Sequence, residues 1–467
     1  MPGEIAIVGA GWAGLSAAVR LTQAGRRVRV YEAAPGAGGR AREARLDFGA
    51  GPVTLDAGQH LLVGAYRECL DLAQLLHDGA APFERHVLSL RDTAGLRLHA
   101  PRLPAPLHLA AALLGARGLS FGERLATVRL MHGLRGDGWR AQAGETVAQL
   151  LRRWRQPATL VDRLWSPLCM ATLNTDAEEA CAATFATVLR DTLGAARGAS
   201  DFVLPRSTLD DLLARPACDW LRARGAKLAF GATVRAIARD NEGWHLQGDA
   251  DRGAATGAAQ LVLALPPYAA ARLLAPLLGN VAARGASAAA RGASAAELDA
   301  FVYDAIMTVY LAWPASARPS LPRWIMLRES RERGEHGQWL FDRGQFREQR
   351  IAAVVISARG RLSDLPPAAI ADGVARQVAG QLGLPRPAAT RTVTEKRATF
   401  RCTPGRPRVE VDHFADVLPG LWLAGDFAWP DYPATLEGAV RSGRAAAERA
   451  LGFDLARRER ARREAGR

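Results

Sequence analysis

The amino-acid sequence predicts an α/β fold with two lobes, one of which is built on a parallel β-sheet. Its 467 residues exceed the ~250–300 at which a single hydrophobic core stops growing, so more than one core is expected. Residues 5–32 follow the order strand, glycine turn, helix, strand, which is the pattern of a βαβ unit. Strand-like runs at 306–313 (IMTVYLAW) and 350–357 (RIAAVVIS) predict a second sheet.

The βαβ unit follows from three local patterns. IAIVG at 5–9 is a short continuous apolar run, as expected of a central parallel strand that is buried on both faces. The stretch 13–25 places Leu15, Ala18 and Val19 on one helical face and stops at Gly25, which suits a helix C-terminus. RRVRVYE at 26–32 alternates with a period of two and predicts the second strand.

The rest of the chain alternates between helical and strand-like regions. Residues 103–165 are mostly helical in pattern, and strand-like runs follow at 226–237, 243–248 and 259–267. The heptapeptide ARGASAA occurs twice in succession between residues 281 and 296 and predicts a low-complexity surface insertion without function. A buried strand at 420–426 (GLWLAGD) and a helix at 435–451 are expected to close the chain.

Composition and charge exclude several classes of protein. A hydrophobic content of 49% and a charged content of 23% are ordinary for a globular protein, and no apolar run reaches the ~18 residues that span a bilayer. The net charge of +14 does not indicate a nucleic-acid partner, because the arginines are spread along the chain without a recognisable nucleic-acid module. The five scattered cysteines form no Cys-x-x-Cys pair, so we expect neither a disulfide framework nor a metal site. No export signal is recognisable, and the expected location is the cytoplasm.

A dinucleotide fingerprint lies between the first strand and the first helix. Its residues are Gly9, Gly11, Trp12, Ala13 and Gly14. The first glycine permits a tight turn, the second lets the backbone approach a pyrophosphate, and the third lets the helix pack on the strand. The helix N-terminus offers free N–H groups to the phosphates. Glu32, eighteen residues after the last glycine, can accept hydrogen bonds from a ribose.

Two further signals favour FAD over NAD as the nucleotide. Gly38-Gly39-Arg40 follows the ribose acid almost at once, and it supplies flexible backbone and a guanidinium beside the pyrophosphate. At the other end of the chain, Asp426 follows Gly425 at a strand terminus, and the helix after residue 435 can aim its positive N-terminus at a flavin ring. A site assembled from both ends of the chain suits a cofactor as large as FAD.

The sequence resembles the FAD-dependent amine oxidase and phytoene desaturase superfamily, and within it the hydroxysqualene dehydroxylase family (squalene-associated FAD-dependent desaturases). The segments GQHLLVGAY at 58–66 and DYPATLEGAVRSG at 431–443 carry this resemblance best. It implies a GR2-type flavoprotein, with a Rossmann-like FAD-binding domain and an interleaved α+β substrate domain. The implied FAD-binding segments are 1–95, 201–280 and 401–467, and the implied substrate-domain segments are 96–200 (helical) and 281–400 (sheet).

The motifs and the resemblance together give a set of expected FAD contacts. The set is Gly9, Gly11, Trp12, Ala13, Gly14, Glu32, Gly38, Gly39, Arg40, Gly58, Gln59, Val234, Gly425, Asp426, Leu436, Glu437, Gly438 and Ala439. Val234 matches the strand whose backbone meets the adenine in the family, and the last four residues match its C-terminal flavin motif.

The resemblance implies that reduced FAD converts hydroxysqualene to squalene with loss of water, in squalene and hopanoid biosynthesis. Such a reaction needs a proton for the leaving oxygen, shelter for an allylic cation and a hydride donor. His60 is the first candidate for the proton donor, because histidine ionises near neutral pH. Asp431 is the second, because a carboxyl in an apolar pocket can remain protonated. Tyr432, with Phe427 and Trp429, could steady a cation. All five also have ordinary structural interpretations as loop, turn or packing residues.

Three alternatives stay open: a carotenoid-type (phytoene-type) desaturase that moves the hydride in the opposite direction, a flavin amine oxidase, and a non-catalytic flavin-fold scaffold for a prenyl synthase. The expected substrate is an isoprenoid, and a prenyl synthase and a membrane surface are candidate partners. The stretch 104–121 (PAPLHLAAALLGARGLSF) is either an interior helix of the second lobe or a segment in the membrane interface. The second interpretation places the protein on the inner face of the cytoplasmic membrane.

Overall fold

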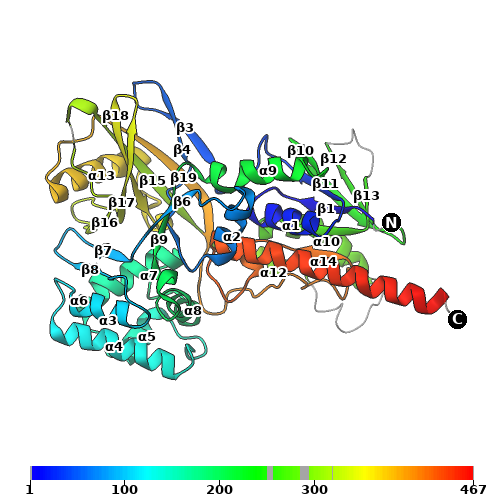
Figure 1. Cartoon of the computed structure of the whole chain (residues 1–467), viewed down its shortest axis with the longest axis horizontal. Helices are drawn as coiled ribbons and strands as arrows, with labels where there is room; N and C mark the ends of the chain where they lie inside the picture. The colour runs from blue at the N-terminus through cyan, green and yellow to red at the C-terminus, as the bar shows by residue number, and fades with distance from the viewer. Residues whose placement is uncertain (1–2, 250–255, 284–293, 318, 466–467) are drawn as a thin grey trace.

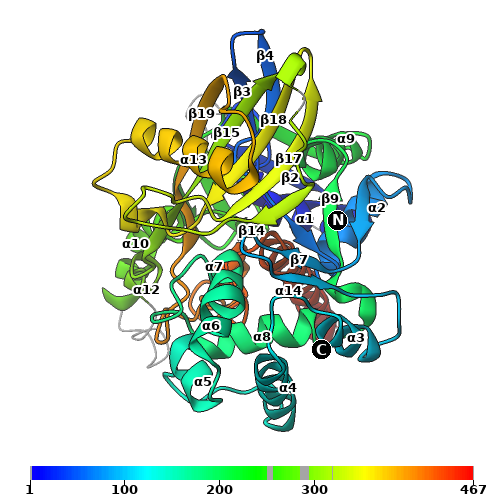
Figure 2. The ribbon, with the colours of Figure 1, turned by 90° about the vertical axis from the view of Figure 1, so that its left-hand side faces the viewer.

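The computed structural model describes residues 3–249, 256–283, 294–317 and 319–465 (Figure 1). One half of the molecule, on the right in Figure 1, contains both chain termini. The other half combines an antiparallel sheet with a group of helices, which lie at the top and bottom of Figure 2. The doubled heptapeptide that we expected to be a low-complexity insertion lies largely outside the described residues.

A five-stranded parallel sheet forms the core of the first half and joins strands from distant parts of the chain. Its order is β10-β2-β1-β14-β20, and every neighbouring pair is parallel. The strands are β1 (Ile5–Val8), β2 (Val28–Glu32), β10 (Lys227–Phe230), β14 (Gln260–Leu263) and β20 (Leu421–Leu423). The predicted βαβ unit and the predicted strand at 420–426 are therefore confirmed, and they lie in one sheet.

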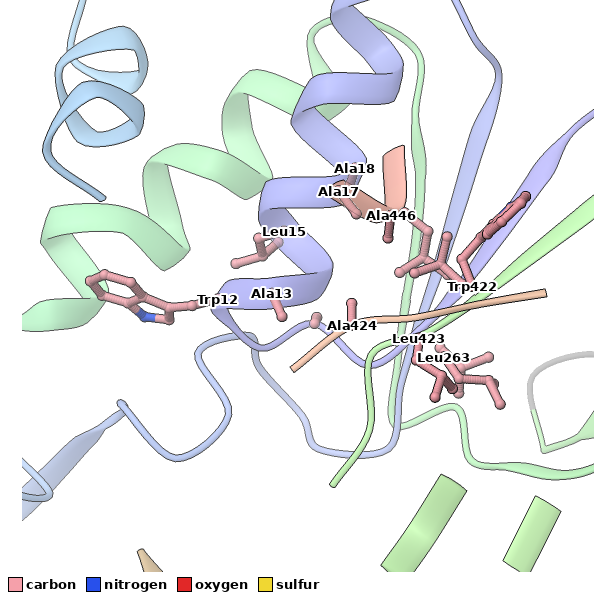
Figure 3. Close-up of a cluster of buried hydrophobic side chains, with 14 of the residues drawn as sticks. Trp12, Ala13, Leu15, Ala17, Ala18, Leu263, Trp422, Leu423, Ala424 and Ala446 are labelled. Carbon is pink, nitrogen blue, oxygen red and sulfur yellow. The ribbon is translucent and has the colours of Figure 1, made fainter. Parts of the chain in front are cut away.

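Helices α1 (Trp12–Gln23) and α14 (Leu436–Ala465) pack closely together beside this sheet. A Cβ on Gly443 would lie 2.1 Å from the carbonyl oxygen of Ala13, so only glycine allows this approach. Ser16 Oγ donates a hydrogen bond to the Val440 carbonyl at 2.9 Å. Figure 3 shows Ala13 at the start of α1 close to Ala424, which follows β20. The first and last helices of the chain are thus fixed to each other at their N-terminal ends.

An antiparallel sheet with the order β16-β17-β18-β15-β19 forms the core of the second half. Its strands are β15 (Tyr303–Pro314), β16 (Trp324–Met326), β17 (Trp339–Phe346), β18 (Gln349–Ile356) and β19 (Ala389–Phe400). Met307, Val309 and Leu311 face α13 (Pro367–Leu382). Tyr310 and Ala312 face the hairpin of β3 (Glu43–Asp47) and β4 (Pro52–Asp56). The runs predicted at 306–313 and 350–357 are confirmed as central strands covered on both faces.

Helices make up the remainder of the second half, as the pattern of residues 103–165 predicts. They are α3 (Leu107–Leu114), α4 (Phe121–Gly136), α5 (Val147–Arg153), α6 (Ala158–Leu160), α7 (Ser166–Leu173) and α8 (Ala182–Thr192). Their core includes the fully buried Trp165 and Phe185 and extends to Trp324 and Phe341 of the antiparallel sheet. Sheet and helices therefore share apolar packing.

Among the described residues, the remaining elements form three small sheets and several further helices. They are β5 (Leu62–Val63), α2 (Arg67–Leu76), β6 (Phe83–His86), β7 (Ser89–Arg91), β8 (Arg97–His99), η1 (Val161–Trp165), η2 (Arg197–Ser200), β9 (Phe202–Pro205), η3 (Asp210–Ala214), α9 (Arg215–Arg222), β11 (Val234–Arg239), β12 (Trp244–Gly248), β13 (Thr256–Ala258), α10 (Pro267–Ala283), α12 (Ala296–Asp299), η4 (Ala315–Ala317), η5 (Arg359–Leu362) and η6 (Asp426–Ala428). Among the described residues, no helix combines the length and the apolar character needed to cross a bilayer. The division of the chain at residues 95, 200, 280 and 400 stays a prediction.

Candidate cofactor and active site

The parallel strands bring the predicted nucleotide motifs to one edge of the sheet. Because β1, β2 and β20 run in the same direction, their C-terminal ends share that edge. Gly9 follows β1, Glu32 ends β2, and Asp426 lies just after β20. This is the arrangement that a nucleotide site made from both ends of the chain requires.

The Gly9–Gly14 loop and the Gly38–Gly39 loop lie in direct contact. Gly9 has a φ of +106°, and a Cβ there would lie 2.3 Å from the Ala264 carbonyl oxygen. A Cβ on Gly14 would lie 1.9 Å from the Gly9 carbonyl oxygen, so α1 can start this close only with glycine. Gly38 donates its N–H to the Ala10 carbonyl at 3.0 Å, which ties the second cluster to the first. At these glycines no side chain covers the backbone on either side of the turn, and a pyrophosphate site needs such uncovered backbone.

The Glu32 carboxylate lies against the first glycine loop. It accepts the N–H of Ala10 at 2.7 Å and the N–H of Ala34 at 2.8 Å. A carboxylate can accept about four hydrogen bonds, so further positions remain for ribose hydroxyls. The N–H of Ala232 donates to the Glu32 carbonyl at 2.8 Å, only two residues before Val234. The first residues of β11 thus approach the ribose acid, while the contact of Val234 with adenine stays a prediction.

An ion pair links the second glycine cluster to the C-terminal segment. Arg40 Nη2 lies 2.7 Å from Asp426 Oδ2, and Arg40 Nη1 donates to the Ala398 carbonyl at 2.6 Å. The other oxygen, Asp426 Oδ1, accepts the N–H of Phe427 at 3.1 Å. Asp426 is buried and Arg40 is partly exposed, so the guanidinium is held in place and still has free N–H donors for an anion.

Helix α14 begins next to Asp426. Gly438 donates its N–H to Thr435 Oγ1 at 3.1 Å, which caps the helix. A Cβ on Gly438 would lie 3.6 Å from the Asp426 carbonyl oxygen, so the first turn lies directly against that residue. Gly425 donates its N–H to Ser442 Oγ at 2.9 Å in the following turn. The positive end of a 30-residue helix is therefore held where the chain ends meet.

The side chain of Glu437 has a structural partner that the sequence did not reveal. Its carboxylate accepts the N–H groups of Glu68 at 3.2 Å and Cys69 at 3.0 Å, in the first turn of α2, and Arg441 Nε at 2.8 Å. Burial raises the pKa of Glu437, and these donors act against that rise. The carboxylate joins α14 to α2, so only the backbone of Glu437 remains for a cofactor contact, and that contact stays a prediction.

Gly58, Gln59 and His60 form a loop against the antiparallel sheet. The N–H of Gln59 donates to Thr308 Oγ1 at 3.3 Å, and Gln59 Oε1 is buried without a hydrogen-bond partner among the described residues. His60 Nδ1 lies 2.7 Å from the Gly58 carbonyl. Since a carbonyl only accepts, Nδ1 carries the proton of the neutral ring and Nε2 carries the lone pair. Burial lowers the pKa of His60, and the nearby Asp56 charge opposes this only in part. This environment favours a neutral His60 and weakens its candidacy as a proton donor.

Asp431 does not lie in the apolar pocket on which its candidacy rested. Its side chain is 74% exposed and lies 2.5 Å from Arg408 Nη2. The turn before Tyr432-Pro433 directs the carboxylate to the surface. The structure therefore removes the physical argument for a protonated Asp431.

Tyr432 belongs to a buried cluster at the start of α14. Its ring centroid lies 4.7 Å from the Arg441 guanidinium, and burial, followed by the charge of Asp191, raises the pKa of its hydroxyl. Tyr66 lies close to Tyr432 and Glu437, and burial raises its pKa as well. Both phenols stay protonated through neutral pH. The sequence contained Tyr66 within GQHLLVGAY, but only the fold places it beside Tyr432.

The remaining aromatic candidates pack in the protein interior. Phe427 packs edge-on against Phe301 with ring centroids 5.7 Å apart, and Trp429 is half-buried. Tyr303, which the sequence did not single out, has a buried hydroxyl without a partner among the described residues. The charges of Asp426 and Arg40 both influence the pKa of the Tyr303 hydroxyl, so this hydroxyl lies near the ion pair. Tyr303 reaches this position because β15 starts near the end of β20 in the fold. No local sequence pattern predicts that relation between the two strands.

These residues fit FAD. The glycine loops leave bare backbone for a pyrophosphate, and Arg40 supplies a guanidinium. Trp12 Nε1, Gln59 Oε1 and the Tyr303 hydroxyl are buried without a partner among the described residues. Buried polar atoms of this kind usually bond to a ligand or to water.

The fold and this site are those of a flavin-dependent oxidoreductase. Residues 12–451 match the family of flavin containing amine oxidoreductases, so the chain belongs to that family, and its cofactor is FAD.

Two curated relatives match over almost their whole length. The hydroxysqualene dehydroxylase of Rhodopseudomonas palustris is 30% identical over 463 residues, which cover 97% of this chain and 99% of the relative. The hydroxysqualene dehydroxylase of Sinorhizobium fredii is 31% identical over 466 residues, with the same coverage of 97% and 99%. Among solved structures, cyclohexylamine oxidase from Brevibacterium oxydans IH-35A has a TM-score of 0.66 at 17% identity, covering 97% of this chain and 100% of that one. The last likeness shows the fold alone.

Proposed function

We propose that this enzyme reduces hydroxysqualene to squalene with loss of water, in the biosynthesis of squalene and hopanoids. The observation that carries the proposal is the similarity to hydroxysqualene dehydroxylases along 97% of the chain, at 30% and 31% identity. The exchange is balanced when a hydride replaces the hydroxyl group and the hydroxyl leaves with one proton as water. The substrate is then an isoprenoid alcohol, and the proposed place of action is the inner face of the cytoplasmic membrane.

The chain's proposed part in cofactor binding follows from the geometry described above. The loops at Gly9–Gly14 and Gly38–Gly39 hold the pyrophosphate with Arg40, and Glu32 holds the ribose. The first turn of α14, residues 436–439, faces the flavin ring. Reduced FAD supplies the hydride when it is bound. The chain has to orient the alcohol, exclude water and deliver one proton.

The proton donor is proposed among His60, Tyr432 and Asp431. Tyr432 is buried and stays protonated at neutral pH, so it can hold the proton until the oxygen leaves. His60 would deliver a proton only below its lowered pKa. Asp431 is exposed and paired with Arg408, which makes it the weakest of the three.

An anaerobic incubation tests the proposed reaction. Photoreduced holoenzyme is mixed with hydroxysqualene, and the isoprenoid products are separated and identified. Squalene is the expected product, and its absence refutes the proposal. Parallel incubations of oxidised holoenzyme with phytoene and, in air, with a panel of amines test the two alternative oxidations. A desaturated carotene would support the desaturase, and hydrogen peroxide formed with an amine would support the amine oxidase. The curated relatives are named as enzymes, which leaves a non-catalytic scaffold without support; a prenyl synthase partner stays a prediction.

A further inference from the structure

Exposed apolar side chains gather on two helices of the second half. Ten large hydrophobic side chains are exposed among the described residues, and six of them lie between residues 103 and 128. These six define the α3–α4 surface: Leu103, Leu107, Leu114, Phe121, Leu125 and Val128. Leu114 is 72% exposed and Phe121 78%. Several large apolar side chains that are exposed on neighbouring helices mark interaction sites more often than scattered single ones do.

α4 carries large apolar side chains on its exposed face as well as on its buried face, although Arg129, His132 and Arg135 are exposed too. Ala126, Leu130 and Leu134 are buried in the helical core, four residues apart. Phe121, Leu125 and Val128, which are four and three residues apart, share the exposed side. A surface helix of a globular protein normally carries polar residues on its outer face. The outer face of α4 is therefore not explained by the packing of the chain itself.

The outer face of α3 continues this surface. His108, Ala112 and Leu113 of α3 are buried, whereas Leu107 and Leu114 point outward. Figures 1 and 2 both place α4 at the end of the helical group that lies away from the antiparallel sheet, with α3 between α4 and the β7–β8 hairpin. The apolar stretch at 104–121 thus buries one face in the helical core and leaves the other exposed.

Hydrogen bonds hold the two helices in this arrangement. Arg124 donates to the carbonyls of Leu114 and Ala116, both at 2.7 Å, which fixes the end of α3 against the start of α4. Ser120 and Glu123 form a capping box at the first turn of α4. The exposed side chains next to these groups are presented by a fixed backbone and cannot fold back into the core without breaking the bonds.

The charge around the α3–α4 surface has one dominant sign. Residues 91–137 contain seven arginines and three acidic residues, namely Asp92 and Asp137 near the two ends and, in the first turn of α4, Glu123. That carboxylate is already bonded to the Ser120 N–H at 2.7 Å and to the Thr159 hydroxyl at 2.5 Å. Arg102, Arg117 and others in the segment are exposed. Apolar side chains with a basic surround complement the anionic headgroups and acyl chains of a bilayer.

We propose that the α3–α4 surface docks this enzyme on an anionic phospholipid bilayer, with both helices lying in the plane of the interface. The inference deepens the proposed function and rests on it in one respect, since a C30 alcohol resides in the bilayer. The docking itself rests on the exposed side chains and the arginines, and it needs no turnover.

The test is sedimentation of FAD-loaded enzyme with vesicles of phosphatidylcholine, with and without phosphatidylglycerol, at low and high salt. Wild-type enzyme is expected to bind the phosphatidylglycerol vesicles, and high salt is expected to weaken that binding. The Leu114→Gln/Phe121→Gln variant should bind at least about tenfold more weakly, because two large side chains no longer enter the interface. The matched control Leu75→Gln/Leu365→Gln changes two exposed leucines elsewhere and should bind like wild type. Arg102→Gln/Arg117→Gln should reduce the difference between low and high salt.

Several outcomes would overturn the proposal. They are wild-type enzyme that ignores the anionic vesicles, a Leu114→Gln/Phe121→Gln variant that binds normally, or a control variant that loses binding equally. Sedimentation velocity tests whether a second copy of the chain, and not a bilayer, occupies the α3–α4 surface. If wild-type enzyme forms dimers that the Leu114→Gln/Phe121→Gln variant does not form, the proposal is overturned as well. Flavin absorbance and melting temperature report that each variant is folded. Turnover of detergent-dispersed hydroxysqualene is measured separately, so a failure of the proposed reaction is distinguishable from a failure of docking.

Discussion

The ion pair between Arg40 and Asp426 gives the most informative perturbation, because it joins the second glycine cluster to the last strand of the parallel sheet. We consider Arg40→Met, Asp426→Asn and the double variant, with FAD affinity as the measured quantity. If Arg40 faces the pyrophosphate, Arg40→Met removes one charge-assisted hydrogen bond of about 1.5–3 kcal/mol, which weakens FAD binding roughly 10- to 150-fold.

Asp426→Asn keeps an acceptor beside the guanidinium but removes the charge that positions it. The Asp426 side chain is 7% exposed and that of Arg40 is 36% exposed, so solvent screens the pair only in part. We therefore expect a coupling energy of about 1–2 kcal/mol in the double-mutant cycle, between the values for exposed and for buried pairs. The loss of FAD affinity caused by Asp426→Asn should therefore be several-fold smaller in the Arg40→Met background than in the wild-type background.

The assay is titration of the apoenzyme with FAD, followed by quenching of flavin fluorescence. Arg152→Met and Glu178→Gln supply the matched control, because that pair lies on the helical lobe with side chains 64% and 65% exposed. The control cycle should leave FAD affinity unchanged. Additive effects of Arg40→Met and Asp426→Asn, or an Arg40→Met variant that binds FAD like wild type, would refute the reasoning.

Three further predictions concern single positions. Gly14→Ala should lose FAD binding, because its Cβ would lie 1.9 Å from a backbone carbonyl, whereas Gly36→Ala meets nothing within 4 Å and should bind FAD normally in the same titration. Glu437→Leu should lower the free energy of unfolding by about 2–5 kcal/mol, because it leaves two N–H groups of α2 without an acceptor and removes the nearer carboxylate partner of the half-buried Arg441; urea unfolding that matches wild type would contradict this. The pH profile of squalene formation separates two proton donors. If His60 is the acid, activity should fall as pH rises through a pKa below the usual 6.5 of histidine, and the His60→Gln variant should not show that fall. If Tyr432 is the acid, activity should be constant through neutral pH, and the Tyr432→Phe variant should lose activity.

Local patterns predicted the elements that build the cofactor edge. The continuous apolar run of β1, the glycine fingerprint and the alternation of β2 are each determined within a few residues. The place of β20 in the same sheet is a long-range property, yet the argument that a large cofactor needs both chain ends anticipated it.

The partners of individual side chains could not be predicted in the same way. Glu437 bonds to residues 368 and 369 positions away, and no spacing rule connects α14 to α2. The lowered pKa of His60 is caused by burial, which outweighs the opposing effects of the Asp56 charge and the Gly58 carbonyl. The exposure of Asp431 depends on the direction of one turn. Sequence therefore predicted which motifs meet at one edge of the parallel sheet, while the surroundings of the three proton-donor candidates could be read only from the fold.

A single anaerobic turnover tests the central claim most directly, namely that FAD held between the two ends of this chain reduces an isoprenoid alcohol. Photoreduced holoenzyme is mixed with excess hydroxysqualene while flavin absorbance is recorded, and squalene is quantified at the end. The account predicts reoxidation of the flavin with one squalene formed for each flavin. A flavin that stays reduced, or one that reoxidises without squalene, would contradict it.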